Sequence, residues 1–221
     1  MALQCGIVGL PNVGKSTLFN ALSNAKAQSA NYPFCTIEPN IGVITVPDNR
    51  LNQLAEIVNP EKILPTTVEI VDIAGLVKGA SKGEGLGNMF LGNIRNTDAI
   101  IHVIRCFDDD NIIHVDGTVN PIRDKEVIDI ELQLKDLESI EKRMSKYHRS
   151  ATNGEKEAKK IYEQLNTIKK GLEAGISARA IKQEEELHED ISDLNLLTSK
   201  PILYVCNVDE KSEMSSCNSS S

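Results

Sequence analysis

The chain has 221 residues, of which 40% are apolar and 25% are charged, and five are cysteines. This composition predicts a globular protein with an ordinary buried core, formed by one domain or by one domain with an insertion. The net charge of −8 argues against a protein that binds polyanions over its whole surface, and no apolar run reaches the length of about 18 residues that a membrane span needs.

The N-terminus and the cysteines indicate the cellular compartment. The first residues lead into an apolar strand without the basic start and apolar core of a signal peptide, so we expect a cytoplasmic protein. No Cys-x-x-Cys pair and no histidine cluster occurs, so neither a zinc site nor a disulfide framework is expected. We expect a monomer that does not bind membranes.

The first predicted strand, residues 3–8, is followed by a phosphate-binding loop. Residues 9–17 read Gly-Leu-Pro-Asn-Val-Gly-Lys-Ser-Thr, and a helix-like run begins at Leu18. Backbone N–H groups of such a loop surround the α- and β-phosphates, its lysine reaches the β- and γ-oxygens, and its serine hydroxyl binds Mg²⁺. Lys15 is therefore also a catalytic candidate. The expected nucleotide-binding residues are Gly9, Asn12, Val13, Gly14, Lys15, Ser16 and Thr17.

Two further segments are expected at the same edge of the sheet. Residues 31–40 form a predicted loop, from which the Thr36 hydroxyl would complete the Mg²⁺ shell only when a γ-phosphate is present. The predicted strand 67–72 ends at Asp72, which opens the motif Asp-Ile-Ala-Gly75. At the carboxyl edge of the sheet, Asp72 would orient Mg²⁺ through water and the Gly75 N–H would approach the γ-phosphate. The expected metal site consists of Ser16, Thr36 and Asp72.

The residue after this motif predicts slow hydrolysis. Leu76 stands where many GTPases carry a glutamine that positions the attacking water, and an aliphatic side chain cannot do this. His114, just past the predicted strand 99–106, is the internal catalytic candidate, although a histidine beside apolar residues is more often structural. Asn12 could instead bind a K⁺ ion.

Residues 122–198 predict an inserted helical unit. Apolar residues recur there at helical spacing in two stripes, and the turn-forming residues 150–154 lie between them, so we expect an antiparallel helical hairpin. The first stripe is Ile130, Leu134, Leu137, Ile140, Met144 and Tyr147, and the second is Ile161, Leu165, Ile168 and Leu172. The segment from Lys142 to Lys170 contains nine basic and three acidic residues, a charge surplus of 9 − 3 = +6 around the hairpin tip. This surplus indicates either an RNA-binding surface or a solvated helix face.

The last predicted strand, 201–206, is followed by Asn207-Val-Asp-Glu210. GTPases read guanine at this place with Asn-Lys-x-Asp, whose aspartate accepts hydrogen bonds from the base and whose lysine stem packs over it. Here the acid is the longer Glu210 and a valine removes the stem, so we expect ATP to bind as well as GTP or better. A polar loop without base recognition is the alternative.

The predicted strands, which also include 42–46, alternate with helices and predict an α/β fold with a mainly parallel sheet. Strands 99–106 and 201–206 are apolar almost throughout, which predicts central strands covered on both faces.

Together, the phosphate loop, Thr-Ile-Glu-Pro-Asn at 36–40, Asp-Ile-Ala-Gly-Leu at 72–76, the Asn-x-x-Glu element and the helical insertion resemble the YchF-type Obg-like ATPases of the translation-factor class of P-loop GTPases. The resemblance covers residues 1–210. It implies ATP preference, Mg²⁺ held through Ser16 and Thr36, ribosome association and a coiled-coil arm within the G domain. It also places Val208 against the base, with Phe107 as a further packing partner.

The resemblance divides the chain into an incomplete P-loop G domain and its insertion. The expected boundaries are 1–121 and 199–210 for the G domain, 122–198 for the helical coiled coil and 211–221 for a disordered tail. The family's C-terminal TGS domain and the end of its G domain are missing, which predicts exposed apolar surface and low stability.

Three functions are compatible with these features. The first is a slow, Mg²⁺-dependent ATPase that associates with the ribosome and regulates translation or a stress response. The second is a GTPase switch in ribosome assembly. The third is a non-catalytic adaptor whose basic hairpin tip binds RNA or the ribosome while the nucleotide only stabilises the fold.

Overall fold

The computed structural model of the chain describes residues 2–24, 40–73, 75, 79, 86–109, 111–181 and 188–209. The predictions for Thr36, Leu76, Glu210 and the tail 211–221 concern residues outside these ranges.

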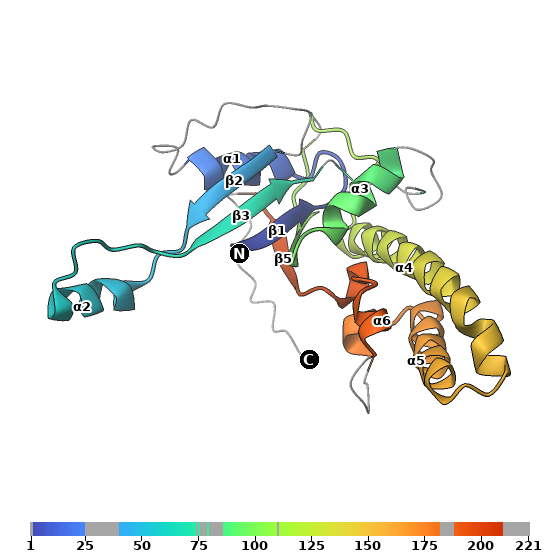
Figure 1. Ribbon diagram of the computed structural model, residues 1–221. Helices are drawn as coiled ribbons and strands as arrows, with labels where there is room; N and C mark the ends of the chain where they lie inside the picture. Colours follow the sequence, from blue (N-terminus) through green and yellow to red (C-terminus); the bar gives the residue numbers. More distant parts are fainter. Residues whose placement is uncertain are drawn as a thin grey trace.

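Five strands of the described residues form one sheet (Figure 1). They are β1 (Leu3–Val8), β2 (Asn40–Thr45), β3 (Thr67–Asp72), β4 (Ala99–Arg105) and β5 (Ile202–Asn207). Their order across the sheet is β2-β3-β1-β4-β5, and all neighbours are parallel except β2 and β3. The predicted α/β class with a mainly parallel sheet is confirmed.

The centre of the sheet is formed by β1 and β4, whose apolar residues are almost completely buried. Ile7, Val8, Ile100 and Val103 are at most 2% exposed. β1 has a parallel neighbour on each side, and helices cover the sheet, so continuous apolar runs are favoured in these strands. The carboxyl ends of β1 and β3 lie together, because Ile7 is paired with Asp72.

β5 is not the doubly covered central strand that its composition predicted. Among the described residues it pairs with β4 alone, and Leu203 and Tyr204 are 61% and 37% exposed. An apolar run indicates that a strand can be buried, but the order of strands decides whether it is covered. β5 is therefore an edge strand in the described part of the chain.

Three shorter helices accompany the sheet: α1 (Lys15–Asn24), α2 (Asn49–Val58) and α3 (Leu86–Arg95). Asp48 caps α2 by accepting a hydrogen bond from the Arg50 N–H at 2.9 Å, and Asn59 ends the helix in the left-handed conformation with φ +42°. α2 contains no buried residue and stands away from the sheet (Figure 1).

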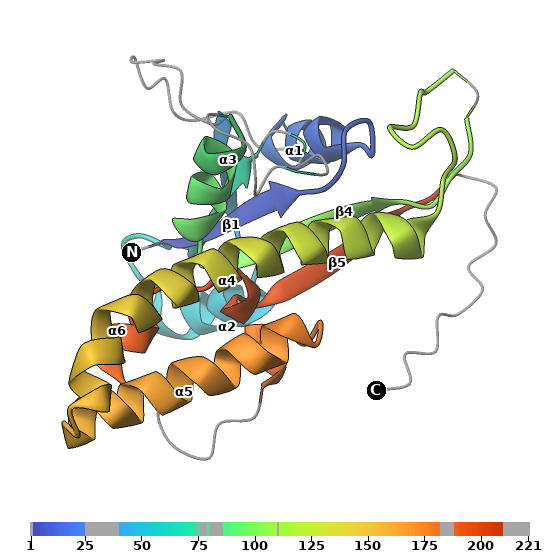
Figure 2. The same ribbon diagram turned by 90° about the vertical axis from the view of Figure 1, so that its right-hand side faces the viewer.

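The helical hairpin consists of α4 (Pro121–Thr152) and α5 (Lys156–Glu173), which pack against each other as antiparallel neighbours (Figure 2). Asn120 caps α4 by accepting from the Arg123 N–H at 3.1 Å, and Pro121 occupies the first turn, where a missing N–H costs nothing. With 32 residues, α4 is about 48 Å long at the usual rise per residue.

Only the second half of α4 belongs to the core of the hairpin. Ile128 and Leu132 pack in the sheet core, whereas Ile140 packs with the α5 stripe in a second cluster. Ile130 and Leu134 were predicted in the hairpin stripe but are 51% and 37% exposed. Each lies two residues from Ile128 or Leu132, which is about 160° around the helix, so the packing of α4 on the sheet turns them outward.

Short helical turns return the chain from α5 to the sheet. They are η1 (Ala178–Ala180), α6 (Glu189–Ser192) and η2 (Leu197–Ser199). No helix within the described ranges combines the length and the apolarity that crossing a bilayer requires.

Candidate active site

The phosphate loop joins β1 to α1, and two of its positions require glycine. Gly9 and Gly14 have φ values of +154° and +99°. A Cβ atom at Gly9 would lie 2.5 Å from the Val103 carbonyl oxygen, and one at Gly14 would lie 2.5 Å from Asn207 Nδ2. Because α1 begins at Lys15, its unpaired N-terminal N–H groups adjoin the loop and form an anion-binding end.

Lys15 lies inside this loop rather than in solvent. The residue is 7% exposed, and Nζ donates a hydrogen bond to the Leu10 carbonyl oxygen at 2.7 Å. Burial lowers the pKa of Lys15 from 10.5 to about 8, and the nearby charge of Asp72 opposes this shift. A desolvated ammonium group forms a stronger hydrogen bond with an anionic phosphate oxygen than with a neutral carbonyl oxygen.

Ser16 and Asp72 come from different elements and meet beside Lys15. Ser16 opens α1, Asp72 ends β3, and the Ser16 hydroxyl donates to Asp72 Oδ2 at 3.0 Å. A hydroxyl and a carboxylate oxygen are hard ligands of the kind that Mg²⁺ binds, so this pair fits the metal. The third expected ligand, Thr36, lies outside the described residues.

Gly75 lies against the phosphate loop. A Cβ atom there would be 3.0 Å from the backbone nitrogen of Pro11 and 3.2 Å from Lys15 Nζ. Its backbone is therefore close to the position that a γ-phosphate bound by Lys15 would occupy.

Asn207 connects the end of β5 to the phosphate loop. Its amide Nδ2 donates to the Val13 carbonyl oxygen at 3.0 Å, which explains why Gly14 cannot carry a side chain. Val208 is half exposed at the same edge. Val13 itself is 1% exposed and packs in the core, so its side chain supports the loop from behind, whereas Thr17 is exposed on α1.

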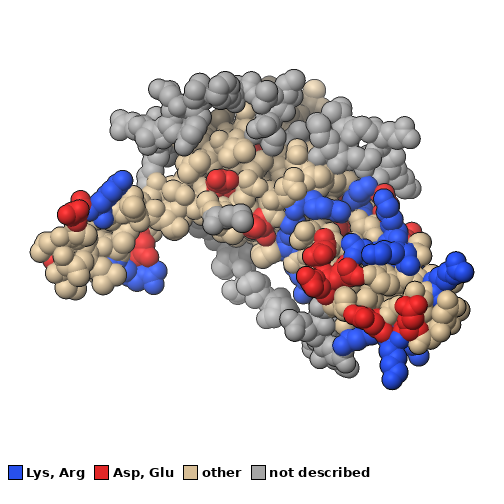
Figure 3. All heavy atoms as spheres, in the orientation of Figure 1, with Lys and Arg blue, Asp and Glu red and all other residues tan. Residues whose placement is uncertain are grey.

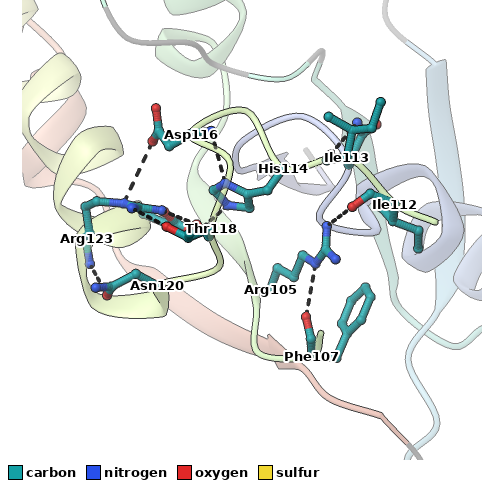
Figure 4. A network of polar contacts seen from close by, with 11 residues as sticks. Arg105, Phe107, Ile112, Ile113, His114, Asp116, Thr118, Asn120 and Arg123 are labelled. Carbon is teal, nitrogen blue, oxygen red and sulfur yellow. Dashed lines mark hydrogen bonds and ion pairs between the residues drawn. The ribbon is translucent and has the colours of Figure 1, made fainter. Parts of the chain in front are cut away.

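A buried arginine organises the segment after β4, and the sequence analysis missed it. Arg105 is 2% exposed and donates to the carbonyl oxygens of Phe107 and Ile112 at 3.1 and 3.0 Å (Figure 4). It also donates to the Asp109 carbonyl oxygen at 3.2 Å. The Phe107 ring stacks on its guanidinium group at 4.6 Å. The signal available in the sequence was a charged residue at the end of an otherwise apolar strand.

The same segment reaches the phosphate loop through Asn12. The Asn12 side chain donates to the Ile113 carbonyl oxygen at 3.1 Å, and Asn12 has φ +62°. The loop after β4 therefore contacts the residue that was expected to bind K⁺.

His114, the predicted catalytic residue, is held in a polar network (Figure 4). It is 7% exposed, its Nδ1 accepts from the Asp116 N–H at 3.1 Å, and its Nε2 lies 2.8 Å from Asp124 Oδ2. Since Nδ1 accepts, Nε2 carries the proton and donates to Asp124. Both ring nitrogens have hydrogen-bond partners, so in this conformation His114 fastens its loop to α4.

His114, Asp116 and Asp124 lie close enough for their oxygen and nitrogen atoms to surround an ion. However, the guanidinium group of Arg123 is 3.0 Å from Asp124 and 3.8 Å from Asp116. A fixed positive charge beside both carboxylates disfavours a metal, so the cluster is an ion-pair network at the start of α4.

The basic residues of the hairpin are partly neutralised. Lys169 pairs with Glu141 at 2.7 Å, and Lys159 lies 3.9 Å from Glu163. Arg143 lies 3.6 Å from Asp190. Figure 3 shows basic and acidic groups interspersed on this part of the molecule. The predicted surplus is therefore spread over a mixed surface on the face shown.

Comparison with known proteins agrees with this geometry. The family described as 50S ribosome-binding GTPase matches residues 4–146. The chain is 57% identical over 210 residues to the ribosome-binding ATPase YchF of Bacillus subtilis, covering 95% of this chain and 57% of that protein. The same protein of Escherichia coli O157:H7 is also 57% identical, with 95% and 58% covered.

A solved structure, that of the YchF GTPase of Schizosaccharomyces pombe, superposes with a TM-score of 0.74 at 40% identity and covers 94% of this chain and 57% of that one. The chain thus spans a little more than half the length of the relatives it matches. The predicted resemblance is confirmed: the chain belongs to the 50S ribosome-binding GTPase family, with YchF-type ATPases among its relatives.

Proposed function

We propose that this chain binds ATP with Mg²⁺ at the phosphate loop and hydrolyses the γ-phosphate slowly. The observation that carries the proposal is the contact between Ser16 and Asp72 beside the buried Lys15. Two segments 56 residues apart thereby supply a hydroxyl, a carboxylate and an ammonium group at one end of α1.

Each group has a definite task in this reaction. Lys15 and the N-terminal N–H groups of α1 bind the phosphate oxygens, and the Gly75 N–H is positioned for the γ-phosphate. Ser16 and Asp72, with Thr36, would hold Mg²⁺, which neutralises charge on the β- and γ-phosphates when bound. Water attacks the γ-phosphorus, the bond from that phosphorus to the β–γ bridging oxygen breaks, and ADP and phosphate leave.

We expect slow turnover from the residue types that are available to activate water. Leu76 offers no polar group, and the His114 ring is bound to Asp124 and to the Asp116 N–H. For His114 to accept a proton, its Nδ1 must leave the Asp116 N–H. A partner or a K⁺ ion at Asn12 is the kind of factor that would accelerate the reaction.

Base recognition and partners complete the proposal. Val208 and Phe107 would pack on the base, and Asn207, Val208 and Glu210 favour adenine over guanine. A GTPase activity is the second candidate, because the matching family is described as GTPases. The name of the relatives supports ribosome association. The candidate surface for this association is the hairpin tip between Lys142 and Lys170. We expect the chain to act as a monomer in the cytoplasm.

Competition for a fluorescent ATP analogue tests this function. Unlabelled ATP should displace the probe at least as well as GTP, and phosphate release should require Mg²⁺. If GTP displaces it tenfold better than ATP, the chain is a GTPase instead.

If charge reversal at Lys142, Arg143, Lys159 and Lys160 leaves RNA and ribosome binding unchanged, the hairpin tip is not the binding surface.

A further inference from the structure

The buried face of α4 carries three carboxylates. Asp124, Glu131 and Asp136 are 3%, 4% and 0% exposed, on the side of the helix that also carries Ile128 and Leu132. A buried carboxylate must be bonded to offset its desolvation, and an apolar side chain often stabilises the fold as well or better. These three positions therefore call for an explanation beyond stability.

Each carboxylate binds a different segment outside α4. Asp124 binds His114, in the loop that also contacts the phosphate loop through Asn12. Asp136 accepts from the N–H groups of Leu197 and Thr198 at 2.8 Å each, just before the strand that ends at Asn207. α4 is thus bonded to two of the segments that surround the nucleotide site.

Glu131 binds the third segment, the one after β3. Its Oε1 accepts from the N–H of Gly79, which has φ +88° and is exposed. Gly79 follows Gly75 by four residues, a distance of at most about 14 Å along the chain. One end of this short segment lies at the expected γ-phosphate position, and the other end is bonded to α4.

α4 continues without interruption from this contact into the hairpin. From Glu131 to Thr152 the helix extends about 32 Å. If a shift of Gly79 moves α4, the movement therefore reaches the tip of the hairpin, which is the candidate partner surface.

We propose that Glu131 is a positioning residue that ties the segment after Gly75 to α4 and thereby couples the γ-phosphate to the hairpin. The inference rests on the proposed function, because it needs a nucleoside triphosphate at the phosphate loop. Glu131 touches no reacting atom. It fixes the far end of the segment that presents the Gly75 N–H, so its contribution is made when the γ-phosphate is engaged.

The test compares Glu131→Ala and Glu131→Gln with the parent chain, using Glu126→Ala as a matched control at an exposed position of the same helix. Glutamine retains an acceptor oxygen at nearly the same place, whereas alanine removes it. Thermal unfolding verifies that each variant is folded. The measurements are kcat and KM for ATP, the affinities for ADP and for a non-hydrolysable ATP analogue, and hydrogen exchange of the hairpin.

For Glu131→Ala we expect kcat to fall about tenfold with KM within twofold of the parent, and the preference for the analogue over ADP to shrink by a similar factor. The analogue should protect hairpin amides in the parent and in Glu126→Ala but not in Glu131→Ala, and Glu131→Gln should restore most of each effect. A Glu131→Ala chain that behaves like Glu126→Ala overturns the coupling alone. A parent chain that binds no nucleotide overturns the proposed function, and the coupling with it.

Discussion

Replacing Asp136 with alanine should destabilise the protein strongly. The Asp136 carboxylate is fully buried and accepts three hydrogen bonds of 2.8 Å, from the Leu197 N–H, the Thr198 N–H and the Thr198 hydroxyl. Leu197 and Thr198 are 0% and 3% exposed, so water cannot replace the lost acceptor without a local rearrangement. The substitution therefore leaves two backbone donors unpaired in the core.

The cost follows from these donors. Each buried unpaired N–H group costs about 1–3 kcal/mol, so the two left by Asp136→Ala should lower the free energy of unfolding by about 2–6 kcal/mol. At an m-value of about 2 kcal/mol per M, the urea midpoint falls by about 2 M. Asp136→Asn keeps one acceptor oxygen and should lose about half as much.

Urea unfolding followed by circular dichroism measures both variants, with Glu126→Ala as the exposed control on α4. The control should stay within about 0.5 kcal/mol of the parent. A loss below about 1 kcal/mol for Asp136→Ala would refute the reasoning, because it would mean that Asp136 does not hold the segment before β5 on α4.

Three further predictions concern the site and the sheet. Because the pKa of Lys15 is lowered to about 8, Lys15 loses its charge above that pH, and ATP affinity by calorimetry should fall by up to about tenfold per pH unit from pH 8 upward. Burial lowers the pKa of His102 from 6.5 to about 4, so the unfolded state takes up the proton first as the pH falls. About 3 kcal/mol of the free energy of unfolding should therefore be lost between pH 6.5 and pH 4. In urea unfolding, His102→Leu should flatten this pH dependence. Gly14→Ala should weaken ATP binding more than tenfold, and adding Asn207→Ala should recover the part caused by the clash with Asn207 Nδ2.

Distinct outcomes would contradict each of these. Equal ATP affinity at pH 7 and pH 9.5 would show that Lys15 keeps its charge or does not bind phosphate. An unchanged acid dependence in His102→Leu would mean that another group titrates. If the double variant binds ATP no better than Gly14→Ala after correction for the loss measured in Asn207→Ala alone, the φ of +99° is the whole cause.

The sequence was sufficient to predict features that depend on local spacing. The phosphate loop, the strand that ends at Asp72 and the two helices of the hairpin follow from glycine positions and apolar periodicity, and the structure places Lys15, Ser16, Asp72 and Gly75 together. These residues lie within or beside short motifs whose geometry is set by their neighbours in the chain.

Features that depend on contacts between distant segments could not be predicted in this way. The exposure of β5 depends on strand order, and the burial of Asp136 depends on a segment 61 residues later. His114 was expected at the nucleotide edge of the sheet, but no local pattern indicated that its ring is bonded to Asp124 in the first turn of α4. From the sequence alone, Arg105 would be expected to mark the solvent-exposed end of a strand. In the structure it donates to three carbonyl groups of the following loop, which enclose it.

Calorimetric binding of ATP in the presence of Mg²⁺ to the parent chain and to Lys15→Ala tests the central claim most directly. The buried ammonium group bonded to Leu10 in the phosphate loop should account for most of the affinity. We predict a loss of more than tenfold for Lys15→Ala, with the fold intact by circular dichroism. Equal affinities for the two chains would contradict the account, because the triphosphate would then be bound elsewhere or not through Lys15.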